Sequence, residues 1–266
     1  MSLNPFLDAV RAGTHPIQAW VWNPSPLSTE IIARSGFDSI GFDLQHGAVD
    51  FSDLYSLFAI ASAHGVTPMV RIPSNDPGWI SRVLDAGAYG VICPDVRSAA
   101  EAEAFVRACR YAPEGERGFG PVRPAMGAPG SRAVSTGYDM AAQNAAVMVI
   151  VQIESPEGLA AVGEIVAVAG VDGVFPGPVD YSVLTTGEVL FDYGDERLGP
   201  PMKAIVDACH DAGKFVGLPA IVPEHVGLFM EMGVDWIQIG NDVAWITAAA
   251  RQTVASAREA IAAAGS

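Results

Sequence analysis

The chain has 266 residues, half of them hydrophobic, and a formal net charge of −15 with a pI near 4.5. An acidic protein of this kind repels phosphate backbones and anionic lipid, so neither nucleic acid nor a membrane surface is an expected partner. No uncharged apolar run reaches the roughly 18 to 20 residues of a membrane span, and the three separated cysteines lack metal-ligand spacing. The composition indicates a cytoplasmic protein with reduced thiols.

Short apolar runs alternate with segments of helical periodicity along the chain. The predicted strands span 18–22, 39–43, 67–71, 90–93, 147–153, 173–175, 215–218 and 236–240. Helices are predicted between them, for example over 53–64, 99–110, 200–212 and 223–232. Eight alternating α/β units of this length predict a parallel (β/α)8 barrel, the TIM fold, as one domain over residues 1–266.

A glycine and a short loop precede the second, fourth, sixth and eighth predicted strands, at Gly36, Gly87, Gly170 and Gly233. Glycine in this position ends a helix by adopting a left-handed conformation. Generic αβ-loop chemistry explains the pattern as well as a repeated unit does. Its recurrence at alternate strands nevertheless favours a closed barrel over an open sheet.

The longest segment without periodicity runs from Tyr111 to about Gly137 and contains Arg117, Arg123 and Arg132. Stretches of this length inside a domain are usually functional or disordered. Since the segment follows the fourth strand and helix, it belongs to the crossover into the fifth strand. We expect its arginines to supply positive charge for an anionic substrate of an acidic enzyme.

The C-terminal segment over residues 243–264 is rich in alanine. A chain this apolar often hides part of its surface between subunits, and this segment is a candidate for such a contact. We therefore expect a homo-oligomer.

The carboxyl ends of the predicted strands carry the candidate chemistry, because barrel enzymes keep their active sites there. The fifth strand delivers Glu154, and Asp180 follows the sixth. Two carboxylates at neighbouring strand ends predict a site for one hard divalent cation. His46, just past the second strand, is interpreted as a catalytic base, although a histidine hydrogen-bonded in a loop is the alternative.

Arg71 ends the third strand and is interpreted as a cation that contacts the substrate. The structural alternative is an ion pair with Asp43 or Asp85, and both interpretations are compatible. Only two lysines occur, Lys203 inside a helix and Lys214 before the seventh strand, so neither is placed for a Schiff base. No glycine-rich loop after the last two strands suits a phosphate, which favours a carboxylate substrate and no organic cofactor.

Six short motifs extend this pattern in one order along the chain. They are Asp43-Leu44-Gln45-His46-Gly47, Val70-Arg71-Ile72-Pro73, Leu84-Asp85-Ala86-Gly87-Ala88, Arg117-Gly118-Phe119-Gly120-Pro121, Val151-Gln152-Ile153-Glu154 and Gly177-Pro178-Val179-Asp180. From Ala19 to Asp242 the sequence resembles the metal-dependent class II pyruvate aldolases of the HpcH/HpaI family. The resemblance implies a barrel of the phosphoenolpyruvate/pyruvate-domain type with Mg²⁺, Mn²⁺ or Co²⁺ on Glu154 and Asp180. It also implies a hexamer, built as a trimer of dimers with exchanged C-terminal helices.

The activity that the resemblance implies is that of an aldehyde-lyase. It would reversibly cleave a 4-hydroxy-2-oxo acid to pyruvate and an aldehyde through a metal-bound pyruvate enolate. Arg71 would donate to the enolate oxygen, and Gln152 would orient the substrate or a metal-bound water. His46, held in its tautomer by Asp43 or Asp85, would be the base for the 4-hydroxyl.

Further contacts are expected around this chemistry. Substrate binding is assigned to Arg117, Arg123 and the backbone amides over Gly177, Pro178, Val179 and Asp180, where a helix start would hold the pyruvate carboxylate. The sequence departs from many relatives at Gln45, where they have Glu, and at Asp95, which would either pair with Arg97 or shape the aldehyde pocket.

Other functions compete with the aldolase interpretation. The same site would serve an oxaloacetate decarboxylase, because loss of CO₂ gives the same enolate, or a related acyl-CoA lyase. A barrel that binds small acids without turning them over is the alternative from another class.

Overall fold

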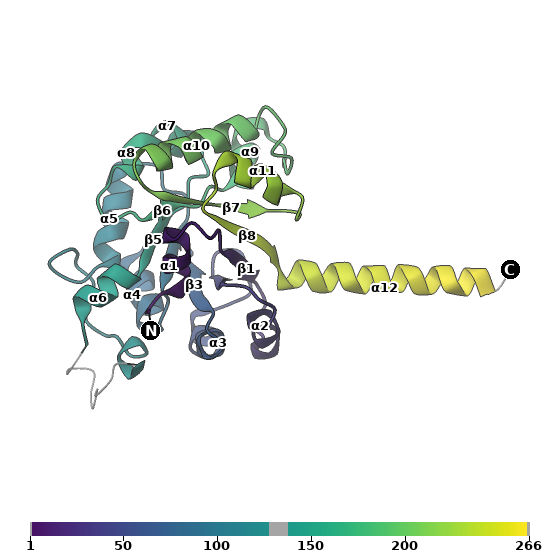
Figure 1. Ribbon diagram of the computed structural model, residues 1–266, viewed down its shortest axis with the longest axis horizontal. Coiled ribbons are helices and arrows are strands. Elements are labelled where there is room, and N and C mark those ends of the chain that lie inside the picture. Colours follow the sequence, from purple (N-terminus) through teal and green to yellow (C-terminus); the bar gives the residue numbers. More distant parts are fainter. Residues whose placement is uncertain (1, 128–137, 265–266) are drawn as a thin grey trace.

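Eight parallel strands form a closed barrel in the computed structural model of the chain, which describes residues 2–127 and 138–264. The strands pair in sequence order, and β1 closes the barrel against β8. They are β1 (Ile17–Val21), β2 (Ser39–Asp43), β3 (Thr67–Arg71), β4 (Gly90–Cys93), β5 (Met148–Val151), β6 (Gly173–Val174), β7 (Phe215–Ala220) and β8 (Trp236–Asn241). The predicted (β/α)8 barrel is confirmed (Figure 1).

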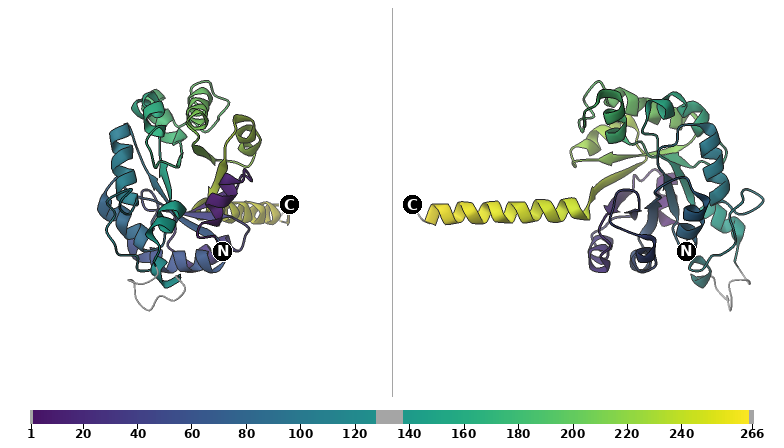
Figure 2. Two further views of the ribbon diagram at one scale, coloured as in Figure 1. Left: turned by 60° about the vertical axis from the view of Figure 1, so that its left-hand side comes forward. Right: turned by 180° about the vertical axis from the view of Figure 1, so that it is seen from behind.

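Helices cover the outside of the barrel (Figure 2). They are α2 (Pro26–Ala33), α3 (Phe51–Ala63), α4 (Pro77–Asp85), α5 (Ala99–Cys109), α6 (Met140–Ala146), α7 (Pro156–Ala160), α8 (Val162–Val166), α9 (Pro178–Thr186), α10 (Gly199–Asp211) and α11 (His225–Met232), with a 3₁₀ turn, η1, over Pro124–Gly127. Ser25, Asp50, Asp76 and Ser98 cap the first four of these helices, each accepting a hydrogen bond from a first-turn amide. The predicted helices differ from these bounds only at their ends.

The four glycines of the recurring αβ loop all have a positive φ. The angles are +96° at Gly36, +104° at Gly87, +94° at Gly170 and +87° at Gly233. An L side chain is strained in this region, so glycine is required to turn each helix into the next strand.

The interior of the barrel is closed at its amino-terminal end by α1 (Pro5–Arg11), a helix that the sequence analysis did not predict. Phe6, Leu7 and Val10 pack into the same buried cluster as Trp236 of β8. The Asn4 side chain caps the helix and also donates to the carbonyls of Tyr89 at 3.0 Å and Ala146 at 2.7 Å. These two carbonyls precede β4 and β5, so the plug is fixed to the amino-terminal rim.

The last helix, α12 (Asp242–Ala264), leaves the barrel after β8 and projects away from it (Figure 1). Of its residues only Asp242 is buried, and apolar side chains such as Val243, Ile246, Val254 and Ile261 are exposed. In residues 2–127 and 138–264 no helix combines the length and apolarity needed for a membrane crossing.

Candidate active site

A cavity of about 530 Å³ opens at the carboxyl ends of the strands. It brings together seven of the predicted site residues, His46, Arg71, Gln152, Gly177, Pro178, Val179 and Asp180. They come from the loops and strand ends of β2, β3, β5 and β6, the end of a barrel where catalytic side chains converge. The other lining residues are Trp20, Trp22, Phe175, Pro176, Phe191, Pro219, Ala220, Ile221, Gln238, Gly240, Asn241 and Ala244.

Arg71 forms a buried, bidentate ion pair with Asp43. Its Nε donates to Asp43 Oδ1 at 3.0 Å and its Nη2 to Asp43 Oδ2 at 2.5 Å, and the guanidinium lies 4.9 Å from the centre of the Trp20 ring. In the described part of the chain, Nη1 has no hydrogen-bond partner. The arginine is therefore held rigidly with a donor still free at the cavity.

His46 lines the cavity, but its ring has no hydrogen-bond partner in the part of the chain that the structure describes. The expectation that Asp43 fixes its tautomer is corrected, since Asp43 Oδ1 accepts from the backbone amides of Gln45 and His46 and from Arg71. Asp43 thus orders the turn that carries His46 and forms no hydrogen bond with the imidazole ring.

Asp85 and the two loop arginines lie away from the cavity within one chain. Asp85 ends α4, at the amino-terminal rim, and accepts from Arg117 Nη2 at 2.8 Å. Arg123 donates to the carbonyl of Phe58 at 3.0 Å and its backbone amide bonds the Asp85 carbonyl. The structure therefore does not place Asp85, Arg117 or Arg123 with His46, because a helix that follows a strand ends at the opposite rim. Arg132 lies outside the described residues.

Glu154 is buried, with only 5% of its surface exposed, and its two oxygens differ. Oε1 accepts from the backbone amide of Asp95 at 2.9 Å, whereas Oε2 is buried without a partner in the described residues. Burial, and after it the charge of Asp180, raises the pKa of the Glu154 carboxyl to about 7. An unpaired buried carboxylate oxygen next to a second carboxylate is costly unless a cation joins them.

The residues present fit a divalent cation. A Cβ on Gly177 would lie 2.4 Å from Glu154 Oε2 and 3.0 Å from Gln152 Nε2, so glycine keeps the space beside the unpaired oxygen open. Asp180 stands in the first turn of α9 and is exposed toward the cavity that it lines. No group of three or more metal-ligating side chains occurs in residues 2–127 and 138–264, so a cation here would take its remaining ligands from substrate and water.

The predicted anion site at the start of α9 is smaller than expected. Gly177 donates its amide to the Ile153 carbonyl at 2.9 Å, and Pro178 has no N–H. Val179 and Asp180 keep backbone amides without a partner in the described residues, at the positive end of the helix dipole. Two donors thus remain for a carboxylate.

Asp95 pairs with Arg97 through two hydrogen bonds of 2.8 and 2.9 Å, as one of the two alternatives predicted. The apolar wall of the cavity was not predicted from the sequence. Trp22 was detectable, because it follows a strand end. Phe191 was not, because it lies in the connection between α9 and α10, where no periodicity assigns a direction.

A carboxylate, an arginine and a histidine line one cavity on the carboxyl face of a (β/α)8 barrel, and a second carboxylate, Glu154, is buried beside the lining residue Gly177. This is the arrangement of a barrel enzyme. The chain belongs to the HpcH/HpaI aldolase/citrate lyase family, whose model matches residues 17–249. The predicted family is confirmed, and with it a place among carbon–carbon lyases.

Curated relatives cover most of the chain. A hydroxypyruvate/pyruvate aldolase of Rhizorhabdus wittichii is 34% identical over 92% of this chain and 95% of its own length. A 2-dehydro-3,6-dideoxy-6-sulfogluconate aldolase of Pseudomonas putida is 33% identical over 89% of this chain and 90% of its own. Among solved structures, an HpcH/HpaI aldolase/citrate lyase family protein of Burkholderia cenocepacia has a TM-score of 0.83, at 29% identity over 96% and 99% of the two chains. Macrophomate synthase has a TM-score of 0.86, at 26% identity over 98% and 92%.

Proposed function

We propose that the protein is a metal-dependent aldehyde-lyase that reversibly cleaves a 4-hydroxy-2-oxo acid to pyruvate and an aldehyde. One observation carries the proposal. The unpaired Oε2 of Glu154, the neighbouring Asp180 and the free Nη1 of Arg71 belong to one site at the carboxyl face. Two carboxylates suit a cation and a free guanidinium donor suits an oxyanion, so the site is equipped for the negative charge of an enolate.

Glu154 and Asp180 would hold Mg²⁺, Mn²⁺ or Co²⁺, which when bound supplies a Lewis acid for the 2-oxo group. Arg71 donates from Nη1 to the oxygen on which charge develops, while Asp43 keeps the guanidinium plane fixed. The amides of Val179 and Asp180 bind the substrate carboxylate, and Gln152 orients the substrate.

During cleavage His46 takes the proton of the 4-hydroxyl as the C3–C4 bond breaks and returns it to C3 of the enolate, which gives pyruvate. During condensation it removes a methyl proton of pyruvate and gives it to the aldehyde oxygen. It lines the same cavity, and its ring has no protein partner in the described residues that would occupy a nitrogen. Asp43 contributes indirectly, because it accepts from the His46 backbone amide and so fixes the turn.

The test uses purified protein treated with chelator and then resupplied with Mg²⁺ or Mn²⁺. Pyruvate plus a panel of aldehydes should give metal-dependent aldol products, detected by chromatography. Oxaloacetate is assayed separately for CO₂ release, which separates a decarboxylase from an aldolase. If the metals restore neither product, the proposed metal-dependent aldol cleavage is wrong.

We also propose that α12 packs on a second copy of the chain within a homo-oligomer, with a hexamer as the expected state. Its exposed Val243, Ile246, Val254 and Ile261 have no cover within the described chain. Light scattering after size-exclusion chromatography measures the mass. A chain ending at residue 242 should dissociate, and an unchanged mass would place the interface elsewhere.

A further inference from the structure

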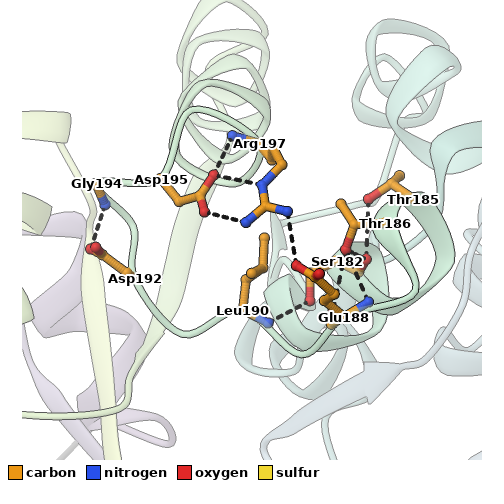
Figure 3. A network of polar contacts seen from close by, with 9 residues as sticks. All are labelled: Ser182, Thr185, Thr186, Glu188, Leu190, Asp192, Gly194, Asp195 and Arg197. Atoms are coloured by element: carbon orange, nitrogen blue, oxygen red, sulfur yellow. Dashed lines mark hydrogen bonds and ion pairs between the residues drawn. The ribbon is translucent and has the colours of Figure 1, made fainter.

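The connection from α9 to α10, residues 187–198, forms hydrogen bonds within itself and to α9 (Figure 3). Arg197 donates to Asp195 from Nε at 3.1 Å and from Nη2 at 2.8 Å, and to Glu188 from Nη1 at 2.9 Å. The Leu190 amide donates to Ser182 Oγ of α9 at 3.1 Å. These bonds define the path of the segment from α9 to α10.

Phe191 lies between two hydrogen-bonded residues and lines the cavity. Before Phe191, the backbone amide of Leu190 donates its hydrogen bond to Ser182. After it, the Tyr193 hydroxyl donates to the Pro219 carbonyl at 2.7 Å. The Tyr193 ring is buried against Phe229, with ring centres 4.8 Å apart. Phe191 itself is 50% exposed. The buried Tyr193 therefore positions an exposed apolar ring at the cavity.

The lining at the end of β7 and in the first turn of α12 is also apolar, whereas β8 contributes the polar Gln238 and Asn241. Pro219, Ala220, Ile221 and Ala244 contribute apolar surface to the cavity that Phe191 lines. Ile221 is 42% exposed, like Phe191 an apolar side chain left open where no protein atom covers it. A fixed apolar surface of this kind suits the hydrocarbon part of a ligand.

The charges around the cavity argue against an anionic tail. Among the described lining residues Arg71 is the single cation, and Asp43 already binds two of its nitrogens. Arg197, in the same segment as Phe191, is paired with Asp195 and Glu188. In the proposed function the Asp180 carboxylate binds the cation and Nη1 of Arg71 donates to the oxyanion, so a second carboxylate or a sulfonate on the aldehyde would find no free cationic partner among the described lining residues.

We infer that the aldehyde released or accepted at this site is uncharged, with an aliphatic or aromatic group that contacts Phe191. This inference rests on the proposed aldolase function and assigns Phe191 as a specificity-determining residue for the aldehyde. Phe191 acts by excluding water from the aldehyde tail and by keeping charged groups out of an apolar surface.

The experiment compares two aldehydes of equal chain length, butanal and 4-oxobutanoate, in Mg²⁺-dependent condensation with pyruvate. The expected kcat/KM for butanal exceeds that for 4-oxobutanoate by on the order of tenfold or more. Phe191→Ala should lower the butanal value by on the order of tenfold, and Phe191→Arg should reverse the preference by supplying a cation. Val189→Arg is the matched control. It places the same charge on an exposed position of the same segment outside the lining, and should leave the preference unchanged.

Exchange of pyruvate methyl protons in D₂O, followed by NMR, reports enolate formation without any aldehyde. If exchange is absent with Mg²⁺, the proposed function fails and the inference fails with it. If exchange occurs but 4-oxobutanoate is preferred, or Phe191→Arg leaves the preference as it was, only the inference is overturned.

Discussion

Two arginine–aspartate pairs with buried arginines lie at opposite ends of the barrel, and they differ in the number of hydrogen bonds that each guanidinium donates within the chain. At the carboxyl end, Arg71 binds Asp43 through Nε and Nη2 and keeps Nη1 free. At the amino end, Arg110 donates from Nη1 to the carbonyls of Asn144 and Val147, and from Nη2 to the Gly170 carbonyl and Asp172.

The difference distinguishes Arg110, whose charge serves the fold, from Arg71, which can still bind a ligand. Arg110 joins the αβ loops that precede β5 and β6, and Asp172 Oδ2 also accepts from the Val149 amide at 2.8 Å. All the partners of Arg110 belong to the chain, so its hydrogen bonds stabilise the folded state. Arg71 has one partner and one open donor at a cavity, so part of its hydrogen-bonding capacity awaits a ligand.

The largest effect expected at the carboxyl end is that of Glu154→Gln. The amide keeps the size of the side chain and an oxygen for the Asp95 amide, but it removes the charge that a cation needs. Metal binding should be lost, and condensation should fall on the order of 10³-fold or more. Calorimetric titration with Mn²⁺ and the pyruvate–aldehyde assay measure both.

The matched control for this variant is Glu157→Gln. Glu157 is an exposed carboxylate at the start of α7, three residues away, and outside the cavity lining. It should bind Mn²⁺ and turn over substrate as the parent does. Stoichiometric Mn²⁺ binding by Glu154→Gln would move the cation site elsewhere.

A smaller loss of activity is expected for Arg71→Lys, which keeps the positive charge beside Asp43. A lysine ammonium is a compact donor and lacks the planar fork that holds Asp43 while presenting Nη1. Steady-state kcat/KM for condensation should fall on the order of 10²- to 10³-fold. A change of less than threefold would show that Nη1 takes no part in catalysis.

Arg110→Ala should have the opposite profile. Removing Arg110 leaves three carbonyls and Asp172, whose side chain is 24% exposed, without their donor, and costs about 3 kcal/mol of unfolding free energy. The urea midpoint should drop while kcat/KM of the folded fraction stays at the parent value. A loss of activity without a loss of stability would erase the distinction between the two arginines.

The sequence predicted the carboxyl end better than the amino end, for a physical reason. Chain order alone places the residues after parallel strands on one rim, so His46, Arg71, Gln152 and Asp180 converge as predicted. Asp85 belongs to a helix end, which the same rule assigns to the other rim, and its expected role beside His46 came from the family resemblance.

Strand order did not predict which side chains at this rim form hydrogen bonds with one another. Asp43 was a candidate for both Arg71 and the His46 ring, and the bidentate guanidinium geometry decides the competition in favour of Arg71. The apolar wall with Phe191 depends on anchors far apart in sequence, such as the bond from Tyr193 to Pro219. Such long-range contacts leave no periodic signal.

The smallest effect expected concerns the pH dependence of the metal-free protein. The pKa of Glu154 is raised from 4.5 to about 7, so between these values the folded state binds a proton that the unfolded state releases. Below pH 4.5 both states are protonated, and above pH 7 burial of the ionised carboxylate opposes folding. Stability should therefore fall as the pH rises through this window, by about 2 to 3 kcal/mol from this group.

Urea unfolding at several pH values, with chelator present, measures this contribution as the difference between the parent and Glu154→Gln. The parent should lose more stability than the variant between pH 5 and 7, because the amide has no proton to release. Saturating Mg²⁺ should remove the difference in slope by favouring the ionised carboxylate in the folded state. Parallel pH profiles for both proteins without metal would mean that Glu154 is ionised throughout. The protein alone would then stabilise the buried, unpaired oxygen of Glu154. The free Nη1 of Arg71 would be the remaining difference from Arg110, which donates four hydrogen bonds within the chain.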